Sequence, residues 1–176
     1  GGIAGVSLSG AIGLYTGGTL KLMGAGEVSS QLSFSGGTLD VDESLSWTAD
    51  WNLNDNATIE IAADKTLSYS GAALDLGANT LTLSGSGTLS NTNALALSDA
   101  LSVLKLSGTN TISGPVELDA GLIEVEESSL LSAALSLGGS AAIDVAEDKT
   151  LSYEGGNLDL GANTLTLSGS GTLSNT

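Results

Sequence analysis

Residues 64–92 read DKTLSYSGAALDLGANTLTLSGSGTLSNT, and this stretch decides the fold because the chain contains it twice. Residues 148–176 read DKTLSYEGGNLDLGANTLTLSGSGTLSNT, which differs from the first copy at three positions only. One constant offset relates the two copies, carrying Asp64 onto Asp148 and Thr92 onto Thr176. A long internal repeat of this kind is typical of proteins that stack one supersecondary unit on the next.

The same offset holds along the rest of the chain. All four lysines obey it, because Lys21 corresponds to Lys105 and Lys65 corresponds to Lys149. We therefore interpret residues 1–176 as one domain made of tandem 84-residue repeats. Their boundaries are 1–84 and 85–168, with the start of a third repeat at 169–176.

Each repeat is divided further by triplets in which two apolar residues flank a residue of any kind. One set of triplets recurs at steps of about 19–23 residues and begins at Leu20, Leu39, Ile59, Leu81, Leu104, Ile123, Ile143 and Leu165. A second set follows at Leu45, Leu67, Leu89, Ile112, Leu130 or Leu131, Leu151 and Leu173. A third set lies at 32–34, 51–53, 74–76, 95–97, 116–118, 135–137 and 158–160.

This pattern predicts an all-β fold, a parallel β-helix (β-solenoid) with three short strands per rung. Alternation with period two turns two side chains inward for each one outward. The steps predict about 21 residues per rung and about eight rungs. Gly, Asn, Asp and Ser between the triplets suit tight corners, and the single proline, Pro115, falls at one of them. Abundant Gly, Ser and Thr argue against helices, and equal spacing favours the solenoid over a hairpin-based sandwich.

Two further expectations follow from stacking. Trp47 and Tyr69 occupy the same place in adjacent rungs, so we expect them one above the other as packing residues. Gly1 begins within the pattern and is not an initiator Met, so we expect a processed form or a segment of a longer array. Unpaired strand edges at either end predict continuation of the array or end-to-end self-association.

The composition excludes several partners. Twenty acidic residues against four lysines give a formal charge of −16, so neither nucleic acid nor an anionic membrane surface is expected to bind. The aliphatic residues are placed too regularly for a disordered acidic chain. No membrane insertion is expected, because no apolar run approaches the roughly 18 residues of a spanning segment.

The outward residues of the first set predict a column: Lys21, Asp40, Glu60, Thr82, Lys105, Glu124, Asp144 and Thr166. Lys21 is expected to pair with Asp40, and Lys105 with Glu124. The paired carboxylates could bind a hard cation such as calcium. We favour a solvated acidic stripe and predict no metal site, since the glycine-rich calcium nonapeptide is missing.

No catalytic residue, cofactor site or cofactor is predicted, and the chain is not expected to be an enzyme. Carboxylate pairs serve glycoside hydrolysis, but here the acids and lysines recur as part of the repeat instead of interrupting it. Threonine ladders raise the alternative of an ice- or glycan-binding face. Thr80-Leu81-Thr82 and Thr164-Leu165-Thr166 occur only once per four rungs, so this signal is weak.

The run TLSYSGAALDLGANTLTLSGSGTLSNT resembles the repeats of bacterial surface β-helix proteins, namely filamentous-haemagglutinin-type adhesins and autotransporter passenger stalks. The resemblance is one of pattern and composition and covers the whole chain. It implies a right-handed solenoid, a location outside the cell or on its surface, and a role in adhesion or fibre formation. The expected function is therefore a structural repeat segment, the stalk or filament body of an extracellular bacterial surface protein.

Overall fold

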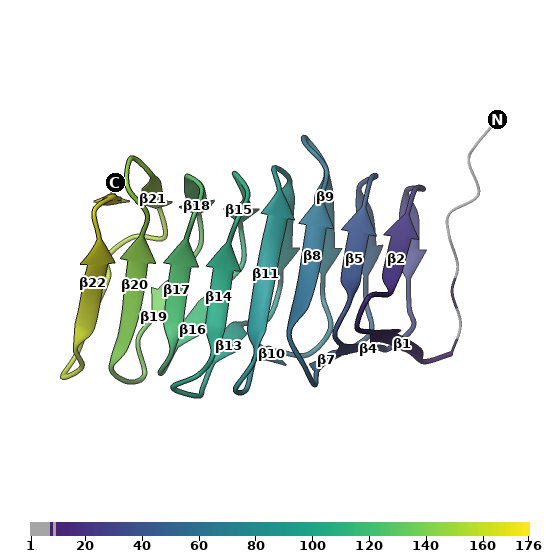
Figure 1. The fold of residues 1–176 in the computed structure, drawn as a ribbon, viewed down its shortest axis with the longest axis horizontal. Coiled ribbons are helices and arrows are strands. Elements are labelled where there is room, and N and C mark those ends of the chain that lie inside the picture. Colours follow the sequence, from purple (N-terminus) through teal and green to yellow (C-terminus); the bar gives the residue numbers. More distant parts are fainter. Residues whose placement is uncertain (1–7, 9) are drawn as a thin grey trace.

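The computed structural model describes residue 8 and residues 10–176 and consists of parallel strands coiled into a rod (Figure 1). Every regular element in these residues is a β-strand, and every strand pair is parallel. The strands form about eight stacked coils of about 21 residues each, with β2 near one end and β22 at the other. The predicted β-solenoid is confirmed.

Each coil has three sides, which correspond to the three sets of triplets. The first side contains β2 (Thr19–Leu22), β5 (Thr38–Val41), β8 (Ala57–Ile61), β11 (Thr80–Gly85), β14 (Val103–Leu106), β17 (Leu122–Val125), β20 (Ala141–Val145) and β22 (Leu165–Gly169). The second side contains β3 (Gly26–Val28), β6 (Leu45–Trp47), β9 (Thr66–Tyr69), β12 (Thr88–Asn91), β15 (Thr111–Ile112), β18 (Ser129–Leu131), β21 (Thr150–Tyr153) and β23 (Thr172–Asn175). The third side contains β1 (Ile12–Tyr15), β4 (Leu32–Ser35) and β7 (Trp51–Leu53), then β10 (Leu74–Asp75), β13 (Leu95–Leu97), β16 (Val116–Leu118) and β19 (Leu135–Ser136).

The third side is divided by a seam. Its strands form two separate sheets, because β7 and β10 are not joined by strand hydrogen bonds. The predicted strand at 158–160 is wrong, since these residues are irregular. Its counterpart one repeat earlier, β10, is hydrogen-bonded only to the strand that follows it, β13. Residues 158–160 have no such neighbour among the described residues, so they have no ladder to join.

The core is a continuous column of aliphatic side chains inside the coils. Leu104 and Leu106 are fully buried on β14, whereas Lys105 between them points outward. On β18 the structure identifies Leu131 as the inward residue, since it is 1% exposed and lies beside Ile112. Pro115 lies at the corner between β15 and β16, as predicted.

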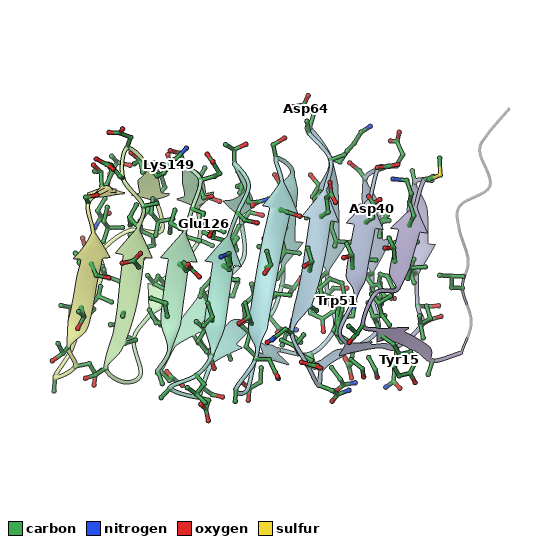
Figure 2. All side chains as sticks on the ribbon, in the orientation of Figure 1. Tyr15, Asp40, Trp51, Asp64, Glu126 and Lys149 are labelled. Atoms are coloured by element: carbon green, nitrogen blue, oxygen red, sulfur yellow. The ribbon has the colours of Figure 1, made fainter. Side chains whose placement is uncertain are left out.

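Corners use the left-handed backbone that the sequence leads one to expect. Asp64 has φ 60° at the corner after β8, and Asp148 has φ 59° at the corresponding corner after β20. Asp64 projects from the end of its coil (Figure 2). Aspartate tolerates this conformation better than most residues with a side chain, because its short polar group bonds locally.

The vertical register differs from the prediction at two places. Leu81 was expected above Ile59, but it lies beside Ala57, and Leu83 lies beside Ile59. The same shift of two residues recurs one repeat later, where Leu165 lies beside Ala141. In this register the large side chain of Leu81 faces the small Ala57, and Gly85 lies beside Ile61. This register aligns five residue pairs, among them the bulky side chains of Leu83 and Ile59.

An aromatic cluster fills one end of the core. Trp47 and Tyr69 are in register on adjacent coils, as predicted. The Tyr69 ring stacks on the Trp51 ring with their centroids 4.1 Å apart. Trp51 also makes edge-to-face contacts with Phe34 and Trp47, at centroid distances of 5.8 and 5.7 Å. All four rings are buried, so they pack the interior and offer no surface to a ligand.

Candidate functional site

The acidic column on the first side is shorter than predicted, because of the register shift. Lys21, Asp40 and Glu60 follow one another, but Ser84 and not Thr82 lies beside Glu60. In the second repeat, Lys105, Glu124 and Asp144 are in line, and Ser168 replaces the expected Thr166. Ser168 donates a hydrogen bond to Asp144. Thr166 lies beside Ala142 instead.

Lysines neutralise part of this column. Lys21 Nζ lies 2.6 Å from Asp40 Oδ2 and 2.8 Å from Asp42 Oδ2, which confirms the predicted partner and adds a second. Lys105 Nζ lies 3.6 Å from the predicted Glu124 and only 2.6 Å from Glu126. Figure 2 shows Asp40 and Glu126 on this side of the rod.

The other two lysines form ion pairs that sequence reasoning missed. Lys65 reaches back to Glu43 of the preceding coil, and Lys149 reaches back to Glu127, each with a distance of 2.7 Å. Both lysines lie at corners, outside the outward column. The only signal in the sequence was that Glu43 and Glu127 are related by the same repeat offset as the two lysines.

These contacts shift the pKa of the lysines on the first side. The hydrogen bond to Asp40, then that to Asp42, raises the pKa of Lys21 above its usual value. The hydrogen bond to Glu126 raises the pKa of Lys105. Because each ammonium is held in its charged form, it acts as a counter-ion to the acids and not as a base.

The first carboxylate of the acidic column lies beside a lysine in each repeat. Within residues 8 and 10–176, no three acidic side chains are grouped so that they could hold a metal ion. In each repeat a lysine ammonium already contacts the first carboxylate of the column. Hard cations need several oxygen ligands around one point, which two neighbouring carboxylates beside an ammonium do not supply.

Hydroxyl groups form ordered rows on the outer face of the second side. Thr66, Thr88 and Thr111 lie beside one another on consecutive coils. Ser46, Ser68 and Ser90 form a second row two residues along the strands. In the sequence these two rows correspond to the triplets Thr-Leu-Ser at 66–68 and 88–90, which do not match the Thr-x-Thr pattern.

The first side carries a further threonine row that only the register reveals. Thr19, Thr38, Thr58 and Thr82 lie side by side on four consecutive coils. Without the shift, Thr82 would have belonged to the acidic column. Single threonines therefore recur on consecutive coils of this side, although the Thr-x-Thr motif does not.

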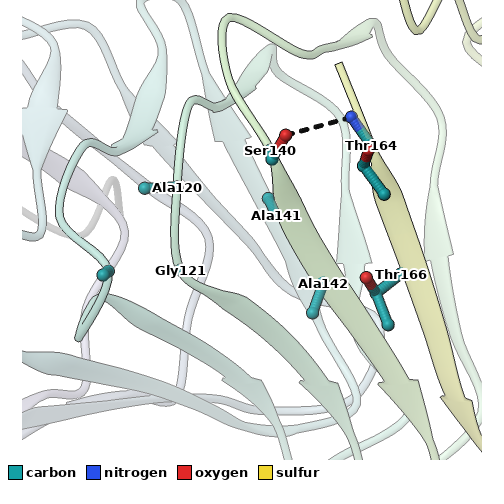
Figure 3. Close-up of a pocket in the computed structure, with 8 residues that line it drawn as sticks. Ala120, Gly121, Ser140, Ala141, Ala142, Thr164 and Thr166 are labelled. Carbon is teal, nitrogen blue, oxygen red and sulfur yellow. Dashed lines mark hydrogen bonds between the residues drawn. The ribbon is translucent and has the colours of Figure 1, made fainter.

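A shallow depression of about 360 Å³ lies where the third side turns into the first (Figure 3). Small residues line it: Ala100, Ala120, Gly121, Ser140, Ala141, Ala142, Thr164 and Thr166. Ser140 Oγ accepts a hydrogen bond of 3.1 Å from the Thr164 amide. None of the lining residues is ionisable, so the depression offers no acid, base or charged nucleophile.

No family model, no curated protein and no solved structure matches the chain. In the part of the chain that the structure describes, no helix is long and apolar enough to cross a membrane.

Proposed function

We propose that the chain is a structural repeat segment, the body of a stalk or filament of an extracellular bacterial surface protein. The observation that carries this proposal is that the repeat extends to individual side chains. The ion pair of Lys21 with Asp40 recurs in Lys105 with Glu124, and that of Lys65 with Glu43 recurs in Lys149 with Glu127. Four-coil blocks that repeat in such detail add length to a rod while presenting the same surface in each block, as a spacer requires.

Dimensions and charge support the same role. About eight coils at roughly 4.8 Å each give a rod about 40 Å long. The net charge of −16 keeps neighbouring rods apart in solution and at a cell surface. The location outside the cell rests on the resemblance to adhesin and autotransporter repeats.

A protease applied to intact cells tests this function. In the organism that encodes the chain, an antibody against residues 64–92 detects the protein before and after proteinase K treatment. Loss of the signal from intact cells, with a cytoplasmic marker protected, is the expected result. A signal that survives until the cells are lysed would refute the extracellular stalk.

A second candidate is a glycan- or ice-binding surface, favoured by the hydroxyl rows on the second side. Thr66, Thr88 and Thr111 lie in register on three consecutive coils, which suits binding to an ordered array of hydroxyls or water. The test is ice-crystal growth and a glycan array with wild type and with Thr88→Lys. Activity that Thr88→Lys abolishes, and that the third-side variant Ser136→Lys retains, would favour this candidate over the stalk.

A further inference from the structure

One strand of the second side reverses the inward and outward pattern of its counterpart in the other repeat. On β6 of the first repeat, Leu45 is buried and Ser46 faces outward. At the corresponding positions on β18, Ser129 is buried and Leu130 faces outward. Burying the leucine and exposing the serine is the arrangement that the hydrophobic effect favours. Core packing therefore does not account for the exchange on β18.

The exchanged residues line a depression where the first side turns into the second. Its volume is about 240 Å³. Three consecutive coils supply the lining residues: Thr109, Asn110, Thr111, Ser128, Ser129, Leu130, Thr150 and Ser152. These residues belong to β15, β18 and β21 or lie just before them, and each of these strands is paired on both sides. The depression is thus enclosed by coils of the rod, and neither end of the chain contributes to it.

A second buried polar side chain lines the same depression. Asn110 is 2% exposed and corresponds to Gly26 of the first repeat. Its Nδ2 donates to the Ser84 carbonyl at 3.0 Å, which fixes the orientation of the amide. Its Oδ1 accepts no hydrogen bond from any described residue. A buried acceptor without a donor is unfavourable, so this oxygen has a function that the internal contacts of the coil do not supply.

The two serines of the depression differ in the hydrogen bonds they have left to form. Ser129 Oγ lies 2.9 Å from the Gly108 carbonyl and 3.0 Å from the Glu127 carbonyl, so its hydrogen is used inside the chain. Ser128 Oγ accepts a hydrogen bond of 3.1 Å from the Thr150 amide, and a hydroxyl that accepts can still donate. The depression therefore offers a hydroxyl donor at Ser128 and a buried acceptor at Asn110.

Leu130 lies between two hydroxyl-bearing residues on the outer face. Thr111 is beside it on the preceding coil, and Ser152 is beside it on the following coil. An apolar side chain flanked by hydroxyls matches a pyranose ring, which has C–H groups on its face and hydroxyls around its edge. Sites for drug-sized ligands have volumes of roughly 300–1,000 Å³, so this smaller depression suits a single ring.

The charges around the depression favour an uncharged ligand. None of the lining residues is ionisable. Lys149 and Glu127 are adjacent in sequence to lining residues, but they pair with each other at 2.7 Å. The net charge of −16 repels acidic ligands.

We propose that this depression binds a neutral saccharide. The C–H face of one pyranose ring packs on Leu130, and hydroxyls at its edge form hydrogen bonds with Thr111 and Ser128. A further ring hydroxyl donates to Asn110 Oδ1, directly or through one water. The site goes beyond the stalk, because it gives one part of the rod a ligand, and it differs from the threonine row of the second candidate in depending on Leu130.

Saturation-transfer NMR of the full chain tests the site. The probes are the methyl glycosides of glucose, galactose, mannose and N-acetylglucosamine, with glucuronate as the acidic comparison. At least one neutral sugar should receive saturation at its ring C–H protons, whereas glucuronate should receive none. In a titration followed by two-dimensional amide NMR, the largest shifts should occur at Asn110, Ser129 and Thr150.

Two leucine variants separate this site from general stickiness. Leu130→Ser removes the apolar contact and should weaken binding at least tenfold. It introduces the residue that the first repeat has at Ser46, so the fold should tolerate it. Leu101→Ser is the matched control, because Leu101 is 69% exposed at a corner outside the depression, and it should bind like wild type. Circular dichroism checks that both variants are folded.

The absence of saturation transfer to every neutral sugar, or equal binding by wild type and Leu130→Ser, would overturn the proposal. The protease test on intact cells is independent of these outcomes. A chain that binds no sugar but is digested at the cell surface would leave the stalk intact and remove only the saccharide site.

Discussion

Replacing Leu106 with Asp is the sharpest test of the inward and outward assignments. Leu106 is fully buried on β14, between Leu83 of the preceding coil and Val125 of the following one. Truncating a buried leucine to alanine costs about 2–5 kcal/mol, through lost burial and the cavity left behind. Aspartate loses the same contacts and places a carboxyl group among aliphatic side chains, so we expect a loss of about 5 kcal/mol or more.

The neighbouring residue supplies the control. Lys105 points outward from the same strand, and Lys105→Ser removes only its ion pairs with Glu124 and Glu126. Exposed pairs of this kind contribute about 0–1 kcal/mol. Serine is also compatible with the outer face, where Ser84 and Ser168 lie on the same side.

Urea unfolding followed by far-UV circular dichroism measures both free energies of unfolding. Hydrogen exchange adds the location, because each coil of a solenoid contacts only its neighbours. Leu106→Asp should reduce amide protection most in β11, β14 and β17 and least in β2. Equal losses for the two variants, or uniform loss of protection along the rod, would falsify the facing and the stacking together.

Three other predictions follow from individual contacts. Stability should fall as the pH rises above about 10, because the folded-state pKa of Tyr69 is raised by burial and that of Lys105 by its hydrogen bond to Glu126. The stabilisation from these two groups is complete below their unfolded pKa values of 10.0 and 10.5, and it is lost as the pH rises through their higher folded-state values. A melting temperature that stays unchanged up to about pH 12 would contradict this prediction. Tyr69→Phe should cost about 1–3 kcal/mol in urea unfolding, because the buried amide of Trp51 donates to the Tyr69 hydroxyl and would lose its acceptor. Gly85→Ala should lower the melting temperature well below that of Gly17→Ala: both glycines have positive φ, but an added Cβ at Gly85 overlaps the Ile61 carbonyl and one at Gly17 meets open space.

The coiled architecture could be predicted because it depends on features that are local in sequence. Triplets such as Leu20-Lys21-Leu22 and Leu104-Lys105-Leu106 already specify which side chain faces inward. Their spacing specifies that strands of the same set are one coil apart. The pairings of Lys21 with Asp40 and of Trp47 with Tyr69 follow directly, since each lies in a coil whose corners match those of its neighbour.

The register shift could not be predicted from the triplets, because it depends on how two strands one coil apart align with each other and not on either strand alone. Counting from the first apolar residue places Leu81 on Ile59, whereas the structure places Leu81 beside Ala57 and Gly85 beside Ile61. This choice determines which outward residues share a row. The rows of Thr58 with Thr82 and of Glu60 with Ser84 were therefore missed together, for a single reason.

The irregular features identify the true repeating unit. The register shift at β8 and β11 recurs at β20 and β22, and the seam after β7 has its counterpart at the irregular residues 158–160 after β19. Features that recur once per long repeat but not once per coil belong to a four-coil block, so the block and not the coil is the unit that stacks. It follows that positions one block apart share an environment, whereas positions one coil apart do not. Leu83 on β11 and Leu167 on β22 are one such pair of corresponding positions.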